Sequence, residues 1–483
     1  AGGESAFLAF DPANPRYVMG GSYQGTVEIL DTQADASTKV MAAPIQYLGM
    51  DAKDMPYRYN WNAPIIWSRW EPGTFYHGAQ VLLKTSDMGR TWRAVSPDLT
   101  RNEKEKQGRP GVPFTNEAVG AEHFGTHPIV AQSPHEAGVI WTGSDDGVVS
   151  LTRDGGATWS NVTPKGLAET LINAIEVSPH DRGTAYIATT RYKFDDHAPA
   201  LYKTTDYGAT WMKIDRGIPD GAFTRVVRED DVRRDLLFAG TERGLFVSFN
   251  GGRDWAPFQR NLPVTPITDL RVHRGALIAA TSGRAFWILD DVALLRQYDP
   301  ATPAFHLYTP ASAPLLSHGS ELDRARPSGT HPTRGVNPAN GIVLYYRLPA
   351  VATDDTVTLR IADASERVIR TLTSVRDTTF EPWDGGPPAS AVLPKAAGLN
   401  RFVWDMRHET LPGVPGVYVE ASYRGHKVPP GRYRVTLTLG DRTQTVDAEV
   451  LPHPLHTIDA ATYAEYDAFM TDAEARLRTM HEA

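Results

Sequence analysis

Several kinds of residue and segment are missing from this 483-residue chain, and each absence removes a class of function. There is no cysteine, which excludes disulfide bonds, thiolate metal ligands and a cysteine nucleophile. No run of about 18 apolar residues occurs, which is the length that a membrane-spanning helix needs. Acidic residues (57) outnumber Lys and Arg (49), and the net charge of −8 gives no overall field that attracts nucleic acid or anionic lipid.

The sequence also lacks the motifs that bind nucleotides and activate serine nucleophiles. We find no phosphate-binding loop, no G-x-G-x-x-G and no G-x-S-x-G. We therefore expect no cofactor and no nucleic-acid partner. The 41 glycines and 36 prolines exceed the usual share of these residues and favour many turns. Short apolar strands separated by turn residues recur along the chain, a pattern that predicts an all-β fold.

One eight-residue motif, the octet, recurs along the first 255 residues. Its clear copies are Thr85–Trp92, Thr152–Trp159 and Thr204–Trp211, and a degenerate copy is Ser248–Trp255. An Asp side chain can accept N–H groups of its own turn, a Gly two residues on can take positive φ, and the Trp anchors the next strand. We predict structural roles for two residues of each copy: Asp87 and Trp92, Asp154 and Trp159, Asp206 and Trp211, Asn250 and Trp255. The spacing suits one four-stranded propeller blade per copy.

Shorter motifs accompany the octets: Gly21–Gly25, Tyr59–Pro64, Ser96–Thr100, Gly143–Gly147, Arg191–Phe194 and Phe286–Asp290. Together they resemble the Asp-box (BNR) repeats of sortilin-like (Vps10-type) and xyloglucanase-like propellers. Nearly the whole chain is similar to large secreted bacterial proteins called BNR-repeat glycosyl hydrolases, and it looks like their C-terminal half. The resemblance implies a secreted, periplasmic or cell-surface location and a glycan or protein ligand. It also implies an earlier propeller portion of the same polypeptide as a partner.

The pattern of strands divides the chain into four parts. Residues 1–309 are predicted to form a β-propeller of about six blades, and residues 310–340 a linker rich in Pro, Ser, Gly and His. Residues 341–453 alternate with period two and predict an Ig-like or fibronectin-like sandwich, with Trp404, Tyr433, Val435 and Leu437 in one core. Residues 456–483 predict an amphipathic helix that Asp459 caps. The chain opens without Met and closes within this helical pattern, so we expect part of a longer polypeptide.

Candidate ligand-binding residues lie where the loops that enter the innermost strands would converge on the channel of a propeller. A polar residue stands before each inner strand: Asn62, His127, Asn173, Arg225 and Asp269. Tyr57, Tyr59 and Trp61 offer aromatic faces for sugar rings, and an insertion contributes Arg191 and Tyr192. The structural alternatives are solvated strand ends and packing between blades.

Hydrolysis of a glycoside would need two carboxyl groups on such loops. The candidates are Glu117, Glu122, Asp195, Asp196 and Asp269. A sialidase reading, with Arg191, Arg225 and Arg284 around a carboxylate, lacks the expected arginine signature. We predict no metal site, because His123 and His127 flank a glycine-containing loop and Asp145-Asp146-Gly147 predicts a tight turn. Two functions remain open: a carbohydrate-active protein that hydrolyses a glycan, and a non-catalytic propeller scaffold that binds a peptide, a partner protein or a glycan.

Overall fold

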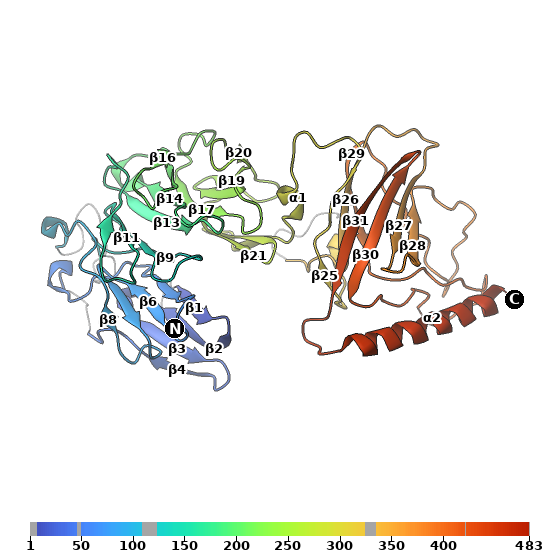
Figure 1. The fold of residues 1–483 in the computed structure, drawn as a ribbon, viewed down its shortest axis with the longest axis horizontal. Helices are drawn as coiled ribbons and strands as arrows, with labels where there is room; N and C mark the ends of the chain where they lie inside the picture. The colour runs from blue at the N-terminus through green and yellow to red at the C-terminus, as the bar shows by residue number, and fades with distance from the viewer. Residues whose placement is uncertain (1–6, 46–49, 109–122, 324–334, 421, 483) are drawn as a thin grey trace. The chain divides into compact units, whose positions relative to one another are not determined.

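The computed structural model describes residues 7–45, 50–108, 123–323, 335–420 and 422–482. The chain divides into two compact units, residues 1–289 (unit 1) and 290–483 (unit 2), shown in Figure 1. Both units are built mainly of β-strands, as the sequence predicts. Within the described residues, we find no helix with the length and apolar character needed to span a membrane.

Unit 1 consists of consecutive antiparallel sheets in which each strand pairs with the next one along the chain. The first two sheets are β1 (Leu8–Asp11), β2 (Asn14–Gly21), β3 (Val27–Asp31), β4 (Ala36–Lys39), and β5 (Ile65–Trp67), β6 (Phe75–Gly78), β7 (Leu82–Thr85), β8 (Arg93–Ala94). The next two are β9 (Ile129–Gln132), β10 (Ile140–Gly143), β11 (Val149–Thr152), β12 (Ser160–Asn161), and β13 (Leu171–Val177), β14 (Ala185–Thr190), β15 (Leu201–Thr204), β16 (Met212–Lys213). The last two are β17 (Thr224–Glu229), β18 (Leu237–Thr241), β19 (Gly244–Ser248), β20 (Ala256–Pro257), and β21 (Ile267–His273), β22 (Ala276–Thr281), β23 (Phe286–Leu289).

These sheets are the blades of a β-propeller. The first strands of successive sheets contact one another in chain order, from β1 through β5, β9, β13 and β17 to β21. The second strands β6, β10, β14 and β18 are buried along their whole length. They are rich in aromatic and β-branched residues, which suit a strand covered by neighbouring blades on both faces.

Each octet occupies the same turn, between the third and fourth strands of its blade, as the repeat predicts. In the first copy the Thr91 N–H and hydroxyl both donate to the carboxylate of Asp87, at 2.9 and 2.7 Å. The Gly89 N–H donates to the hydroxyl of Thr85 at 2.8 Å. The hydrogen bonds from Thr91 lower the pKa of Asp87 to about 2, so this carboxylate is an acceptor for its own turn.

The octet tryptophan joins its blade to the preceding one. The indole N–H donates to the carbonyl oxygen of the residue that follows the fourth strand of the previous blade, at 2.5–2.9 Å in four copies. The donor and acceptor pairs are Trp92 and Val40, Trp159 and Val95, Trp211 and Val162, and Trp255 and Ile214. Trp255 is buried and the other three tryptophans are half-buried.

The octet glycine permits this approach. Gly89 has a φ of +81°, and a Cβ on this residue would lie 2.8 Å from the Cβ of Val40. A side chain at this position would therefore both strain the backbone and push away the blade that receives Trp92. The octet thus serves as a turn within its own blade and as a contact surface for the preceding one.

We expect substitutions of Trp159 to separate the indole hydrogen bond from the packing of the ring. Trp159→Phe keeps an aromatic ring and removes the donor to Val95, which should lower the free energy of unfolding by about 1 kcal/mol. Trp159→Ala also removes the ring that packs beside Leu82 and Val130, and should cost roughly 3 kcal/mol or more. Urea unfolding of both variants measures the difference. Equal losses would contradict a separate role for the indole N–H.

The degenerate octet keeps the same hydrogen bond with donor and acceptor exchanged. In this copy the Asn250 amide donates to the carboxylate of Asp254 at 3.0 Å, and the Asp254 N–H donates back to the Asn250 side-chain oxygen at 3.0 Å. In the other copies a hydroxyl donates to an Asp carboxylate. The two unusual residues of this copy therefore compensate each other.

Because the two residues compensate each other, we predict that a second substitution can restore the stability that a first one removes. Asn250→Asp should place two carboxylates against each other and lower the free energy of unfolding by about 1 kcal/mol or more. Adding Asp254→Thr restores the arrangement of the other copies and should recover the loss. The free energies of unfolding of the two single variants and the double variant form the test. If the change in the double variant equals the sum of the changes in the two single variants, residues 250 and 254 are not coupled.

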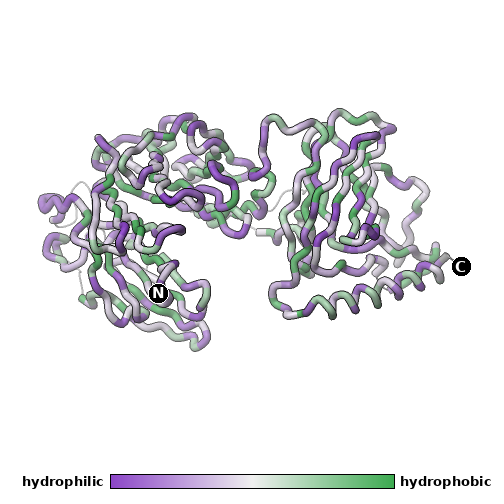
Figure 2. The backbone as a smooth tube through the Cα atoms, in the orientation of Figure 1, coloured by the Kyte–Doolittle hydropathy of each residue, from purple (hydrophilic) through white to green (hydrophobic). Residues whose placement is uncertain are grey.

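Unit 2 holds two sheets that share one core. The first sheet joins β24 (His306–Leu307), β26 (Ile342–Leu348) and β29 (Gly398–Trp404). The second joins β25 (Ala313–Pro314), β31 (Arg442–Leu451), β30 (Gly431–Leu439), β27 (Val357–Ala362) and β28 (Val368–Thr373). Strand residues of unit 2 alternate between apolar and polar in Figure 2, and the inward-facing ones form a sandwich core.

The predicted core residues of the sandwich are confirmed. Trp404, Tyr433, Val435 and Leu437 are buried in one cluster, and the rings of Trp404 and Tyr433 meet edge to face at 5.4 Å. The division between the units at 289/290 falls before the expected boundary at 309/310, because β24 and β25 pair with strands of the sandwich. Part of the expected 310–340 linker, residues 324–334, lies outside the described residues.

The short helices complete the structure: η1 (Tyr23–Gly25), η2 (Ala52–Asp54), η3 (Lys104–Lys106), η4 (Tyr192–Phe194), η5 (Glu321–Asp323) and α1 (Ala293–Arg296). The long helix α2 (Ala460–Glu482) is capped by Asp459, whose carboxylate accepts the Thr462 N–H at 2.8 Å, as predicted. Polar side chains attach α2 to the rest of unit 2: Glu474 is buried, and Arg478 donates to the carbonyl oxygens of Glu409 and Thr410. Phe469, in contrast, is 70% exposed, so the apolar positions of α2 do not all face the sandwich.

Candidate ligand-binding rim

The loops that enter the innermost strands lie at one face of the propeller, which we call the rim. Because every blade is an antiparallel meander, the loop between the second and third strands reaches the same face. The octet turns lie at the opposite face. Backbone hydrogen bonds connect the two kinds of rim loop, as between the Asp145 N–H and the Thr126 carbonyl oxygen at 3.0 Å, and between Glu242 and Phe223 at 3.0 Å.

A polar network fills the rim of the second and third blades. The guanidinium of Arg58 is buried, forms an ion pair with Asp98 at 2.7 Å and donates to the carbonyl oxygen of Gly125 at 3.1 Å. The carboxylate of Asp145 accepts the Thr126 N–H at 2.8 Å and the Thr126 hydroxyl at 2.6 Å. These bonds fix the loop that leads into β9, so much of the network has a structural role.

Two adjacent carboxyl groups in this network have perturbed acidity. Burial, together with the charge of Asp146, raises the pKa of Asp145 to about 7, against the opposing effect of the hydrogen bonds from Thr126. Burial also raises the pKa of Asp146, whose side chain accepts the Arg101 N–H at 2.8 Å. The side chain of Asp145 keeps part of its surface exposed to solvent, whereas Asp146 is fully buried. A carboxyl group with a perturbed pKa that keeps some exposure, as Asp145 does, is a candidate for acid–base chemistry.

An aromatic shelf occupies the rim of the fourth and fifth blades. The ring of Tyr192, on η4, stacks on Phe223 with centroids 5.5 Å apart and planes 22° from parallel. The guanidinium of Arg225 lies 5.1 Å from the Phe223 ring and forms two contacts of 2.7 Å with Glu242. His197 borders the same ring at 5.8 Å. We call Tyr192, His197, Phe223, Arg225 and Glu242 the shelf.

Arg191 and Asn173 lie beside the shelf and are already hydrogen-bonded to the protein. Arg191 forms an ion pair with Asp196 at 3.0 Å and also donates to the carbonyl oxygen of Glu169. The Asn173 amide donates to the hydroxyl of Thr190 and to the carbonyl oxygen of Thr224 at 3.4 Å. Arg191 thus orients the loop that carries Tyr192, and Asn173 ties β13 to β17.

The remaining predicted residues do not gather at one point. Asp269, on β21, forms an ion pair with Arg228 at 2.8 Å, and the side chain of Asp195 is fully exposed to solvent. Asn62 is exposed, and its N–H donates to the Asn60 side chain at 3.1 Å. Glu117 and Glu122 lie outside the described residues.

Tyr59 and Trp61, which were expected to offer faces to a sugar, pack against other aromatic rings. Tyr59 is buried and stacks on His77 at 5.0 Å, so its ring does not form an open wall for a sugar. Trp61 is half-buried and stacks on Tyr23 at 5.4 Å. His127 is completely buried and contributes no surface to the rim. The positions of Tyr59, Trp61 and His127 therefore agree with a packing role.

Sequence reasoning missed Phe223, Glu242 and Arg58. Phe223 directly precedes β17 and Glu242 directly follows β18. Only the pairing of these two strands brings the two residues together. Arg58 stands between Tyr57 and Tyr59, and a charged residue within this aromatic segment was the available signal.

We expect acid to destabilise unit 1 through its buried histidines. Burial lowers the pKa of His77 and of His127 to about 4 from 6.5, so both are neutral at pH 7. Between pH 6.5 and 4 the unfolded chain binds more protons than the folded one, so stability is lost as the pH falls through this window, by up to roughly 3 kcal/mol per histidine. Thermal melts of His127→Gln at pH 7 and 4.5 should show a smaller loss than the wild type. His273 is exposed, so His273→Gln should lose as much stability on acidification as the wild type does. If His127→Gln also loses as much as the wild type, burial of His127 is not a cause of the acid sensitivity.

Comparisons with known proteins give no family for this chain. No protein-family model and no curated protein matches it. Solved structures are similar at a low level. They include "YCF48 bound to D1 peptide" (13% identity, TM-score 0.40), with 59% of this chain and 79% of that chain covered.

Two glycoside hydrolase structures are also similar. One is the GH74 enzyme of Niastella koreensis (14% identity, TM-score 0.41), with 91% of this chain and 64% of the enzyme covered. The other is the GH74 xyloglucanase of Xanthomonas campestris (16% identity, TM-score 0.39), with 91% and 72% covered. At these TM-scores the similarities carry no argument, and the blade architecture rests on the strand pairings of this chain.

Proposed function

We propose that unit 1 is a carbohydrate-binding propeller and that the shelf at its rim holds a hydroxyl-rich glycan. The observation that carries this proposal is the position of Tyr192, which is 40% exposed although one face of its ring stacks on Phe223. The stacking fixes the orientation of the ring, and the exposed part offers an apolar surface to the C–H face of a sugar. A rigid aromatic platform binds at low entropic cost.

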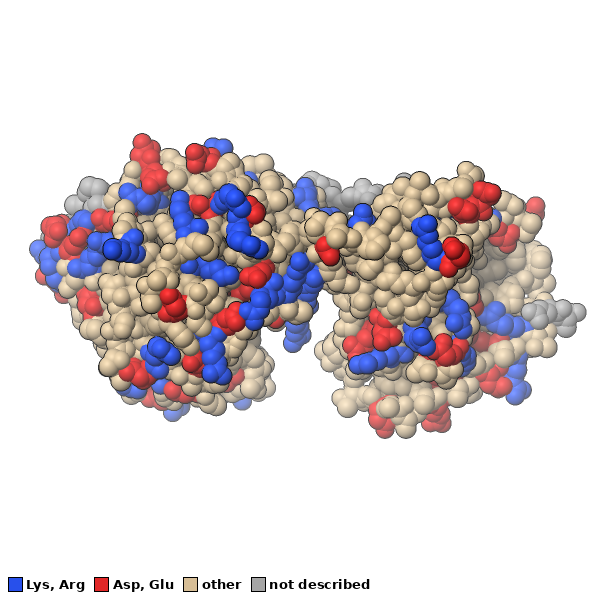
Figure 3. Space-filling model, turned by 45° about the horizontal axis from the view of Figure 1, so that its top comes forward, with Lys and Arg blue, Asp and Glu red and all other residues tan. Residues whose placement is uncertain are grey.

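Charged and polar groups surround this platform in fixed positions. The two contacts between Arg225 and Glu242 hold the guanidinium beside the ring, and the ion pair with Asp196 does the same for Arg191. Each arginine keeps further N–H groups that can donate to sugar hydroxyls, and each carboxylate keeps acceptor capacity. Because both arginines have carboxylate partners, the shelf suits a neutral glycan better than an acidic one. On the face of unit 1 drawn in Figure 3, Lys and Arg are interspersed with Asp and Glu.

A second candidate function is hydrolysis of the bound glycan. Its supporting observation is Asp145, a half-buried carboxyl group on the rim with a pKa raised to about 7. A carboxyl group that is partly protonated at neutral pH is the kind that protonates a leaving glycosidic oxygen. The family resemblance found in the sequence, a secreted Asp-box glycosyl hydrolase with an Ig-like module, agrees with this candidate and remains a prediction. The sortilin-like alternative of a peptide or protein ligand remains one as well.

Binding can be tested with cello-oligosaccharides as neutral probes and oligogalacturonides as acidic ones, titrated calorimetrically into the whole chain. We expect the neutral probes to bind more tightly. Tyr192→Ala should weaken their affinity about tenfold, equivalent to about 1.4 kcal/mol. The control is Trp70→Ala, which removes an aromatic ring of equal exposure, 40%, from a loop at the opposite face. The proposal fails if neither probe binds, or if Trp70→Ala weakens binding as much as Tyr192→Ala does.

Hydrolysis is tested separately by measuring new reducing ends. If Asp145 is a general acid, Asp145→Asn should abolish release of reducing ends and leave oligosaccharide affinity within about twofold, a difference below 0.5 kcal/mol. Binding without release of reducing ends in the wild type would leave the binding proposal standing and remove the hydrolase candidate.

A further inference from the structure

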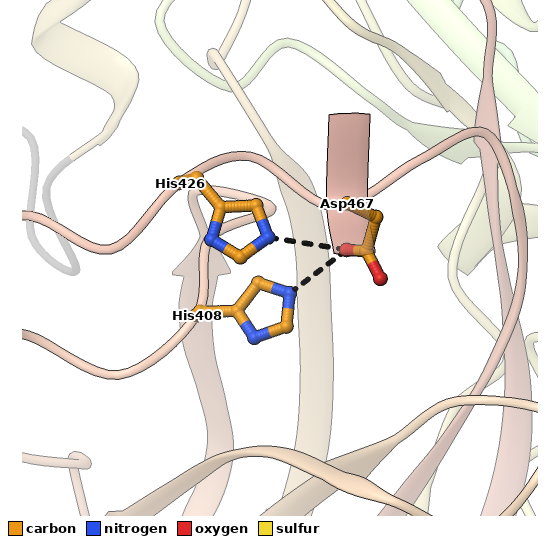
Figure 4. A group of neighbouring side chains, drawn as sticks. All are labelled: His408, His426 and Asp467. Carbon is orange, nitrogen blue, oxygen red and sulfur yellow. Dashed lines mark hydrogen bonds and ion pairs between the residues drawn. The ribbon is translucent and has the colours of Figure 1, made fainter. Parts of the chain in front are cut away.

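We infer that His408, His426 and Asp467 bind a divalent transition-metal ion such as Zn²⁺, which fastens helix α2 to the sandwich of unit 2. His408 and His426 stand on two neighbouring loop segments, joined by a hydrogen bond from the His408 N–H to the His426 carbonyl oxygen at 3.1 Å. Asp467 comes from α2, and the three side chains point toward one another (Figure 4). The inference concerns unit 2 and does not depend on the function proposed for unit 1.

The distances between the three ligand atoms match the spacing around a metal ion. The Asp467 Oδ1 atom lies 3.1 Å from the Nε2 atom of His426 and 3.4 Å from the Nε2 atom of His408. All three atoms lie within 4.8 Å of one another. In a tetrahedral zinc site with bonds of about 2.0–2.1 Å, neighbouring ligand atoms are about 3.3 Å apart. Two imidazole nitrogens and one carboxylate oxygen are ligands that zinc prefers, with a fourth position left for water.

A second set of contacts orients two of the three ligands. The Nδ1 atom of His426 lies 3.0 Å from the Glu474 carboxylate, which therefore favours a proton on Nδ1 and leaves Nε2 for the metal. The other oxygen of Asp467, Oδ2, forms an ion pair with Arg367 at 3.0 Å. Arg367 is held in turn by Asp363 at 2.9 Å. Outer carboxylate and arginine groups of this kind fix the geometry of metal ligands.

Burial supports a site that excludes most of the competing water. The side chain of His426 is 1% exposed and that of Asp467 13%. The Nε2 atom of His408 is buried as well, and the Asp467 carboxylate lies 3.4 Å from it. The two rings now stack at 4.0 Å with planes 16° apart, so binding requires each ring to turn until both Nε2 lone pairs meet at one point.

A metal here would add to the polar contacts between α2 and the sandwich. Asp467, Glu474 and Arg478 help to attach the helix, and the ring of Tyr466 meets that of His426 at 6.0 Å. Phe469 and Met480, in contrast, are each 70% exposed. An ion shared by α2 and two loops adds bonds that exist only when the helix is docked. Metal binding would therefore stabilise the docked helix by mass action.

The test uses the whole chain after dialysis against EDTA. Titration with Zn²⁺ should show one site, and hydrogen exchange of the α2 amides should slow when Zn²⁺ is present. Titration with Co²⁺ should give the intense visible absorption of a four-coordinate ion. His408→Gln and Asp467→Asn should each weaken Zn²⁺ affinity at least tenfold and remove the slowing of exchange in α2. His408→Gln changes the less buried histidine, so it provides a folded variant if Asp467→Asn proves unstable.

The matched control is a second pair of neighbouring histidines in the loop before α2. The rings of His453 and His456 lie 4.1 Å apart, and His453→Gln removes one of them while leaving the proposed site intact. We expect His453→Gln to bind Zn²⁺ as the wild type does. The inference is overturned if Zn²⁺ does not bind, if His408→Gln and Asp467→Asn bind it with unchanged affinity, or if His453→Gln removes the binding.

Discussion

The hydrogen bond from each octet indole to the preceding blade is the interaction on which the order of unit 1 depends. A blade has two apolar faces and no core of its own, so it is stable only when its neighbours cover both faces. The octet meets this need at a fixed place, because Trp159 reaches the carbonyl oxygen of Val95 while the Asp154 turn holds the indole in position. The Val95 N–H is bound to Leu82 within its own blade, so the acceptor is rigid as well.

This placement leaves the opposite face free to vary. The octet turns fix the propeller at one face, and the rim loops can differ from blade to blade without loss of register. In the second and third blades the rim holds a polar network around Arg58 and Asp145, and in the fourth and fifth it holds the shelf with Tyr192 and Arg225. The scaffold and the candidate site therefore depend on different residues, although the same meander positions both.

Unit 2 uses different forces for its sandwich and for its helix. The two sheets meet through an apolar core that includes Trp404 and Tyr433. Helix α2 attaches in large part through charged and imidazole groups, with His426 between Glu474 and Asp467 and the ring of Tyr466 beside His426. Such contacts gain less from burial than an apolar face does, and they depend on geometry and on any ion that they hold. The attachment of α2 is therefore the part of unit 2 most sensitive to its surroundings.

The sequence by itself determined the blades, the position of the octet turns, the core of the sandwich and the cap of α2, because each depends on residues close in the chain. Periodicity places Val435 and Leu437 on one strand face, and the spacing from Asp459 to Thr462 suits a cap. The shelf and the histidine cluster were decided only by tertiary structure. Strand pairing brings Phe223 beside Glu242, and helix docking brings Asp467 to histidines far away in the sequence. No local pattern encodes such encounters, because they depend on how complete elements pack.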